Sequence, residues 1–217
     1  MGSSYDVNPT TVLGVSYTSS VPLTFKRIFD FDRNGTYDDF NFELPSELGV
    51  GISSQHGDFT FSTDVKQIFW SETQGFGAMG WKDQTVLAMG VVHDWLPGTS
   101  SWRMGYNYSP SVVGDKTDLS ASNGYYAFGS GQYLDSNIAF FNLVGFGPAL
   151  VAGQSFTLGA DYRFSPFFKL DLAAEFILPD TVSHSGKTSL AGPDDTDAVY
   201  SAKNEGLIVS AALTWAL

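Results

Sequence analysis

The segment 30–38 reads Asp-Phe-Asp-Arg-Asn-Gly-Thr-Tyr-Asp and places oxygen-bearing side chains at the spacing of a calcium-binding loop. The side chains at its first, third, fifth and ninth positions are Asp30, Asp32, Asn34 and Asp38. Gly35 stands at the sixth position, where such loops turn sharply, but Asn41 stands at the twelfth, where a glutamate usually binds the ion with both oxygens. The segment is therefore a candidate weak calcium site. The alternative is an acidic, solvated loop that turns at Asn34-Gly35, and no other cofactor is expected.

The histidines do not suggest catalysis. His56 and His93 lie next to short predicted turns, whereas His184 lies in a long predicted loop beside Ser183 and Ser185. A hydrolase needs its general base within hydrogen-bond reach of its nucleophile. Serines around one histidine are ordinary loop composition, so the chain is expected not to be an enzyme.

A further group of chemically notable residues is the aromatic set of the long segment 110–147. Loops of this length are usually functional or disordered. Aromatic side chains here could form a surface groove for a hydrophobic ligand, or they could pack on one another and cover the end of the fold. The residues are Tyr125, Tyr126, Phe128, Tyr133, Phe140 and Phe141.

The elements that would position these residues are strands, because eight stretches of the chain alternate apolar and polar residues. In the first stretch Leu13, Val15 and Tyr17 share one parity, and Gly14 and Ser16 share the other. Successive strand residues point to opposite faces, so each stretch has one apolar face. The other stretches lie within 39–52, 58–69, 87–95, 101–109, 150–164, 168–178 and 207–217.

The links between these stretches alternate in length. The short links are 53–58, 96–100 and 164–167, and the long polar links are 26–37, 71–83, 110–147 and 180–205. In outer-membrane barrels, short turns face the periplasm and long loops face the outside. This asymmetry predicts an all-β, transmembrane antiparallel β-barrel of about eight strands.

The tryptophans support this prediction. In that orientation Trp95, Trp102 and Trp215 lie at the periplasmic rim, and Trp70 and Trp81 lie at the outer rim. Amphipathic aromatic rings favour the headgroup level of a membrane. A water-soluble β-sandwich with tryptophans in its core is the alternative.

Composition is compatible with a barrel and excludes other classes. The mean hydropathy of −0.03 is close to zero, but this does not exclude a membrane face, because apolar and polar residues that alternate along a barrel strand cancel in the average. A net charge of −12 and the lack of a basic patch argue against a nucleic-acid partner. The chain contains no cysteine, which excludes disulfides and thiolate sites. Residues 1–9 are expected to be disordered or an added start, the rest of 1–217 forms one domain, and an export signal is expected to have been removed or to lie upstream.

Several local patterns together resemble the FadL/TodX family of outer-membrane transporters for long-chain fatty acids and other hydrophobic compounds. Leu13-Gly14-Val15-Ser16-Tyr17-Thr18-Ser19 is similar to a strand of that family, as is the segment 64–71, which ends in Trp70-Ser71. Gly80-Trp81-Lys82-Asp83 is similar to its entry into the next strand. Arg103-Met104-Gly105-Tyr106, followed by Tyr108-Ser109-Pro110, resembles another of its motifs. The order of these segments matches the C-terminal part of a family member.

The resemblance implies an integral protein of the Gram-negative outer membrane, in contact with lipids, that takes up hydrophobic small molecules by diffusion. It implies capture at the outer aromatic loops, transfer into the lumen, and release sideways or inward. The chain would form part of a larger barrel of this family. The alternative is a small closed barrel that serves as a structural or adhesive anchor without transport, and the sequence does not predict an oligomeric state.

Charged residues on the polar parity are candidates for lining the lumen. Eight strands close on an interior that side chains can fill, whereas a wider barrel leaves a lumen. The charges would pair as a polar plug in the first case, and in the second they would line water. The candidates are Asp64, Lys66, Arg103, Asp161, Arg163 and Glu175.

Overall fold

The computed structural model describes residues 1–29, 35–77, 81–112, 153–187 and 197–215. These residues form a nine-stranded antiparallel sheet and a separate two-stranded ribbon. The strands of the sheet are β1 (Gly2–Asn8), β2 (Thr11–Thr18), β5 (Glu47–His56), β6 (Phe59–Ile68), β7 (Gln84–Leu96), β8 (Ser100–Tyr108), β9 (Gln154–Ser165), β10 (Phe168–Lys187) and β11 (Asp197–Trp215). The strands of the ribbon are β3 (Val21–Phe29) and β4 (Asp38–Leu44).

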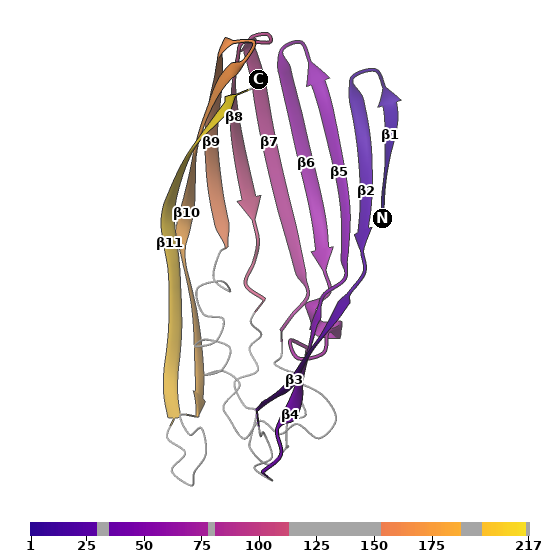
Figure 1. Cartoon of the computed structure of the whole chain (residues 1–217), viewed down its shortest axis with the longest axis vertical. Coiled ribbons are helices and arrows are strands. Elements are labelled where there is room, and N and C mark those ends of the chain that lie inside the picture. Colours follow the sequence, from indigo (N-terminus) through magenta and orange to yellow (C-terminus); the bar gives the residue numbers. More distant parts are fainter. Residues whose placement is uncertain (30–34, 78–80, 113–152, 188–196, 216–217) are drawn as a thin grey trace.

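The main sheet is curved and twisted, and its strands follow one another in chain order (Figure 1). The turns between β1 and β2, β5 and β6, β7 and β8, and β9 and β10 are short and lie at one end of the sheet. Gly57 and Gly98 give two of these turns the positive φ that a side chain would strain, 60° and 75°. The three predicted short links are confirmed, since β5 and β6, β7 and β8, and β9 and β10 are each joined by a short turn. The described sheet is not closed, because its edge strands β1 and β11 do not pair with each other.

The apolar parity forms one continuous exposed face, which we call the apolar face. It includes Val15 on β2, Val50 on β5, Met89 on β7 and Leu172 on β10, each about half exposed. The opposite, polar face carries the charged and small residues. A single sheet that exposes a large apolar face suits lipid rather than water. The alternative of a β-sandwich is wrong, because no second sheet packs on this one in the described part of the chain.

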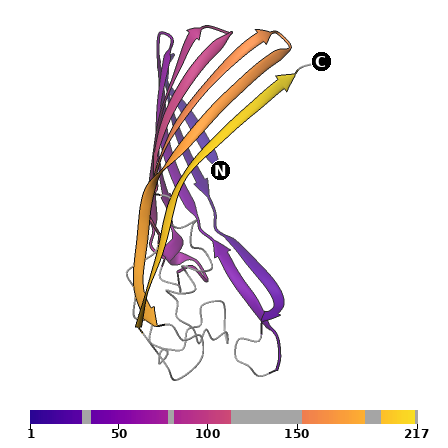
Figure 2. The same ribbon diagram turned by 90° about the vertical axis from the view of Figure 1, so that its left-hand side faces the viewer.

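The first two predicted stretches do not continue as single strands. The pairing of β2 with β5 ends at Thr18 and Glu47, and the pairing of β3 with β4 begins at Val21 and Leu44. Pro45 lies in this gap and has no N–H to donate to a ladder. The ribbon bends out of the plane of the sheet (Figure 2).

Two further predictions are corrected. Residues 2–8 form strand β1, which pairs with β2, so residues 1–9 are not a disordered start. Most of the predicted loop 180–205 is strand, because the ladder between β10 and β11 continues from Asp180 opposite Asn204 to Lys187 opposite Asp197. The two parts of this ladder are separated by a bulge at Leu178 and Pro179, where proline is tolerated.

The buried core of the described residues lies near the long-link end. Trp70, in the 3₁₀ helix η1 (Trp70–Glu72), packs against Phe76 and Trp81 with ring centroids 5.0 and 4.9 Å away. Phe76 also packs edge-on against Phe42 of β4 at 4.6 Å. Trp81 is only 6% exposed. Trp70 and Trp81 therefore lie at the predicted end of the sheet, but they do not face the membrane interface, because they pack on Phe76 and hold the ribbon to the link between β6 and β7.

The other tryptophans lie at the short-turn end, as predicted. Trp95 and Trp215 are 58% and 72% exposed. Trp102 packs beside His93, which stacks on Phe59 with ring centroids 4.1 Å apart. Within the described residues no helix is both long and apolar enough to cross a membrane.

Candidate functional site

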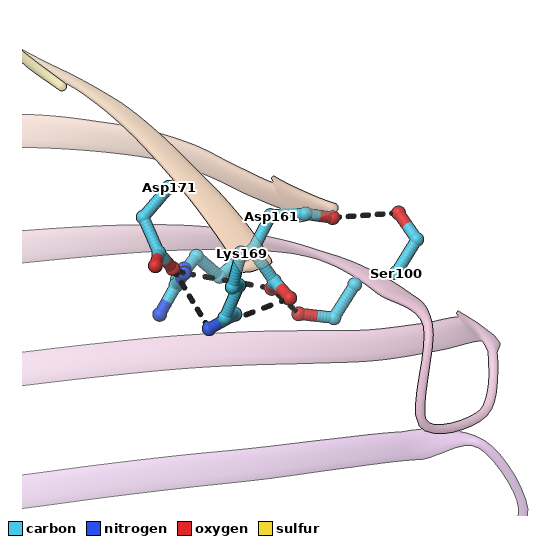
Figure 3. Close-up of polar contacts among 6 residues, drawn as sticks. Ser100, Asp161, Lys169 and Asp171 are labelled. Atoms are coloured by element: carbon cyan, nitrogen blue, oxygen red, sulfur yellow. Dashed lines mark hydrogen bonds and ion pairs between the residues drawn. The ribbon is translucent and has the colours of Figure 1, made fainter. Parts of the chain in front are cut away.

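The polar face holds a four-charge cluster near its short-turn end. It consists of Arg103, Asp161, Lys169 and Asp171, which come from β8, β9 and β10 (Figure 3). Asp161 and Asp171 stand directly opposite each other on neighbouring strands. Like charges in that position repel, so the pairing of β9 with β10 needs cations close by.

Both cations of the cluster bridge both acids. The Arg103 guanidinium lies 2.9 Å from the Asp171 carboxylate and 3.5 Å from that of Asp161. The Lys169 ammonium lies at the same two distances from the same two carboxylates. The cluster therefore has no net charge.

The position of Arg103 depends on Gly159, its partner in the ladder between β8 and β9. A Cβ at Gly159 would lie 2.9 Å from Cγ of Arg103 and 3.1 Å from its Nε. The absence of a side chain lets Arg103 lie flat across β9 and reach Asp171 on β10. Asp161 is held further by Ser101, whose hydroxyl donates to its carboxylate, and by Ser100, whose hydroxyl donates to its backbone carbonyl at 2.7 Å.

A second charged pair lies on the other half of the polar face. The Lys66 ammonium on β6 is 3.0 Å from the Glu47 carboxylate on β5. Lys66 also lines a recess of about 670 Å³ that lies over β1, β2, β5 and β6. Small residues floor the recess, and they include Gly14, Ser16, Gly49 and Gly51. The side chain of Asp64 lies across Gly51, where a Cβ would collide with it.

A smaller recess of about 370 Å³ adjoins the cluster. Its lining includes Arg103, Asp171, Gly159, Ala173 and Ser210. The polar face therefore combines paired charges with small side chains, and it leaves open space in front of the sheet. This arrangement can accommodate a solute or another segment of protein.

The predicted lumen residues all lie on the polar face, but they do not form one network. Arg103 and Asp161 are in the cluster, whereas Asp64 and Glu175 carry no ion pair among the described residues. Arg163 lies opposite Lys169 at the end of β9, and its backbone N–H donates to the carbonyl of Thr99 at 2.7 Å. The sequence did not predict the pairing of Lys66 with Glu47 or the role of Ser101, because alternation gives the face of a residue and not its neighbours across strands.

Other predicted site residues cannot be placed. The aromatic ligand residues Tyr125, Tyr126, Phe128, Tyr133, Phe140 and Phe141 lie outside the described residues. So do Asp30, Asp32 and Asn34 of the calcium segment, while Asp38 is described only as the first residue of β4. In the described part of the chain no cluster of three or more acidic or histidine side chains is arranged to hold a metal ion.

Neither a family model nor a curated protein matches the chain. Among solved structures the chain is similar to a FadL homologue of Pseudomonas aeruginosa, with a TM-score of 0.63 and 13% identity over 99% of this chain and 51% of that one. It is also similar to the toluene transporter TodX of Pseudomonas putida, with a TM-score of 0.53 and 14% identity over 98% of this chain and 47% of that one. The chain folds as part of a FadL-type barrel.

This likeness establishes the fold and confirms the resemblance at that level. The chain spans about half the length of each of these solved structures. An open sheet is what half of such a barrel wall would present. The prediction of a β-barrel fold is therefore confirmed, and the alternative that the described sheet closes by itself as a small barrel is not observed.

Proposed function

We propose that the chain forms part of the wall of an outer-membrane channel through which hydrophobic small molecules diffuse without a chemical step. The observation that carries this proposal is the division of one sheet into two faces. The apolar face is exposed along its strands, as lipid contact requires. The polar face is floored by small residues that leave recesses rather than a filled core.

The FadL-type fold supports the same function, because one of the similar structures is described as a toluene transporter. Long-chain fatty acids, which the sequence resemblance implies, and uncharged hydrophobic compounds both suit such a channel. They differ in a carboxylate group. The proposed route ends in release from the lumen, sideways or inward.

The proposal can be tested by narrowing the recess. Gly14 lines the recess, and a Cβ built on it meets no atom within 4 Å. We expect Gly14→Phe to reduce uptake of a labelled hydrophobic compound several-fold in cells that make the complete gene product. The matched control is Leu13→Phe, which places the same ring on the apolar face at a position that does not line the recess, and it should leave uptake unchanged.

Two results would contradict the proposal. One is a complete gene product that gives no uptake above that of cells lacking it, and the other is an equal effect of the two substitutions. The first result would favour the alternative, a structural or adhesive membrane anchor. Insertion of each variant is checked by its resistance to protease in isolated outer membranes.

The aromatic residues of the segment 110–147 remain the proposed capture site. Replacing Tyr125, Tyr126 and Phe128 together with serine should slow uptake at low ligand concentration more than at high concentration, because capture limits the rate when ligand is scarce. An unchanged concentration dependence would favour the alternative in which these rings only pack on one another.

A further inference from the structure

We propose that this wall selects uncharged hydrophobic molecules over ionised carboxylates, so that alcohols and hydrocarbons pass more readily than fatty-acid anions. The inference rests on the proposed channel function and narrows its substrate class. It follows from how the charges of the polar face are already paired.

Three cations of the polar face, Lys66, Arg103 and Lys169, are already paired with carboxylates of the protein. Lys66 is held by Glu47 at 3.0 Å. Arg103 and Lys169 are each held by Asp171 at 2.9 Å and by Asp161 at 3.5 Å. A ligand carboxylate could bind one of these cations only by displacing a protein carboxylate. The displaced group would then be left unpaired, which is costly away from bulk water.

The charges that lack a partner in the described sheet are mostly acidic. Asp64 stands opposite Gly51 and Ala88, and Glu175 stands opposite Thr157 and Ile208, so neither has a cation across the ladder. Both lie in the middle of their strands. An anion in front of this face therefore meets repulsion rather than a counter-charge.

Arg163 is the exception, but its position limits its effect. It lies two residues before the end of β9, next to a short turn, and it is exposed. A carboxylate beside it stays in contact with water, where ion pairs contribute little. Arg163 therefore does not offset the loss of hydration that an anion suffers deeper in the channel.

The physical reason for the selection is desolvation. Moving an ionised carboxylate out of water is unfavourable unless a cation and hydrogen-bond donors replace the water. An alcohol of the same chain length has the same hydrophobic contribution without that cost. Two ligands that differ only in the head group can therefore isolate the effect.

The experiment compares uptake of labelled dodecanol and dodecanoate at neutral pH. It uses cells that make the complete gene product and lack other transporters for these compounds, and uptake by cells without the product is subtracted. We expect the wild type to take up dodecanol at least tenfold faster than dodecanoate. A tenfold ratio corresponds to a free-energy difference of about 1.4 kcal/mol between the two head groups. Equal rates would overturn the inference and leave the proposed channel function standing. Absence of uptake for both compounds would overturn the channel function and the inference with it.

Two variants test the cause. Asp171→Asn leaves Arg103 and Lys169 with one carboxylate between them, so the preference for dodecanol should fall several-fold. Glu175→Gln removes an unpaired negative charge without breaking an ion pair of the described sheet, so it should shift the ratio in the same direction even where Asp171→Asn does not insert.

Glu205→Gln is the matched control. It removes the same charge from a side chain that is 57% exposed and pairs with Lys203. Glu205 lies on β11 opposite the bulge of β10 and shares the parity of Leu207, so it is not on the polar face. Its ratio should equal that of the wild type. A ratio that changes equally in Glu205→Gln and Glu175→Gln would overturn the inference, because the selectivity would then follow net charge rather than the polar face.

Discussion

At the scale of single residues, the four-charge cluster allows two strands to pair although each places an aspartate opposite the other. Asp161 and Asp171 would repel across the ladder between β9 and β10, and Arg103 and Lys169 approach them from the rows on either side. Gly159 is part of the same arrangement, since Arg103 crosses the sheet over it. The cluster therefore contributes to strand pairing as well as to the charge of the polar face.

Asp161 should be the most sensitive acid of the cluster, because its side chain is only 12% exposed and accepts from Ser101 as well as from the two cations. We expect Asp161→Ala to lower the free energy of unfolding by roughly 1–3 kcal/mol, the cost of leaving buried partners unsatisfied. The control Glu205→Ala breaks an exposed pair and should cost about 0–1 kcal/mol. Urea unfolding in lipid vesicles measures both, and equal costs would show that the cluster does not stabilise the sheet.

A second prediction at this scale concerns Gly77, in the link that packs on the ribbon. A Cβ there would lie 2.4 Å from the carbonyl oxygen of Ser71 and 2.8 Å from that of Thr73. Backbone atoms cannot move aside cheaply, so Gly77→Ala should cost about 1–3 kcal/mol and loosen the aromatic packing of Trp70 and Trp81. Gly14→Ala, which meets no atom within 4 Å, is the control. Tryptophan fluorescence during unfolding should report the difference, and an unchanged midpoint for Gly77→Ala would contradict it.

At the scale of elements, local alternation predicted the strands and their faces well. The parity of Leu172 and Asp171, for example, gave the face of each, because neighbouring strand residues must point to opposite sides. The same rule could not predict where a ladder stops. The break at Pro45 and the bulge at Pro179 depend on pairing with another strand, which a single stretch of sequence does not specify.

The aromatic residues show a second limit of sequence reasoning. Trp70 and Trp81 have the composition of an interface belt, but the link that carries them folds back on the ribbon and buries them. Tertiary contacts between distant segments decided their environment. For the candidate site, the sequence indicated which charged residues share a face, whereas the partners of Lys66 and Asp161 required the register between strands.

The two faces of β10 give a direct test of membrane placement. Leu172 is 49% exposed on the apolar face, and Ala173 next to it borders the recess beside Arg103. Leu172→Arg should cost about 2–4 kcal/mol in a bilayer, because the charge would face hydrocarbon. Ala173→Arg should be much milder, since its side chain would enter an open polar space. Similar costs for the two variants in lipid-vesicle unfolding would refute the assignment of the faces.

The ribbon carries the calcium prediction, which stays a proposal. If Asp30, Asp32, Asn34 and Asp38 bind one ion, calorimetry with added calcium should give a heat signal that the double variant Asp30→Ala, Asp32→Ala abolishes. The affinity should be weak, with a Kd of about 10⁻⁴–10⁻³ M, as in extracellular calcium modules. The control is Asp83→Ala, an acid outside the segment, and loss of the heat signal in this variant would point to nonspecific binding by the acidic surface. If the wild type gives no heat up to millimolar calcium, the calcium proposal is wrong and the segment is a solvated turn.

At the scale of the whole molecule, the number of strands decides which partners can complete the wall. The nine described strands of the main sheet alternate in direction, so the edge strands of the described sheet, β1 and β11, run the same way. Closing the sheet on itself would therefore join parallel strands, and so would joining the edges of two copies in one membrane orientation. Outer-membrane barrels of the bacterial single-chain type are antiparallel with an even number of strands. An antiparallel closure needs a segment that contributes an odd number of strands between β11 and β1.

This geometry predicts that the 217-residue chain alone is not a competent channel. Reconstituted in liposomes, it should take up no more labelled dodecanol than empty vesicles, whereas the complete gene product should give clear uptake. The edges can be examined separately with Tyr5→Cys on β1 and Leu213→Cys on β11, because the chain has no cysteine of its own and both positions lie near the short-turn end. The double variant should form neither an internal disulfide nor a disulfide-linked dimer under mild oxidation in the membrane. Efficient cross-linking together with uptake would show that the edges meet despite their parallel direction, by self-closure or by association of copies, and that this chain supplies a complete pore.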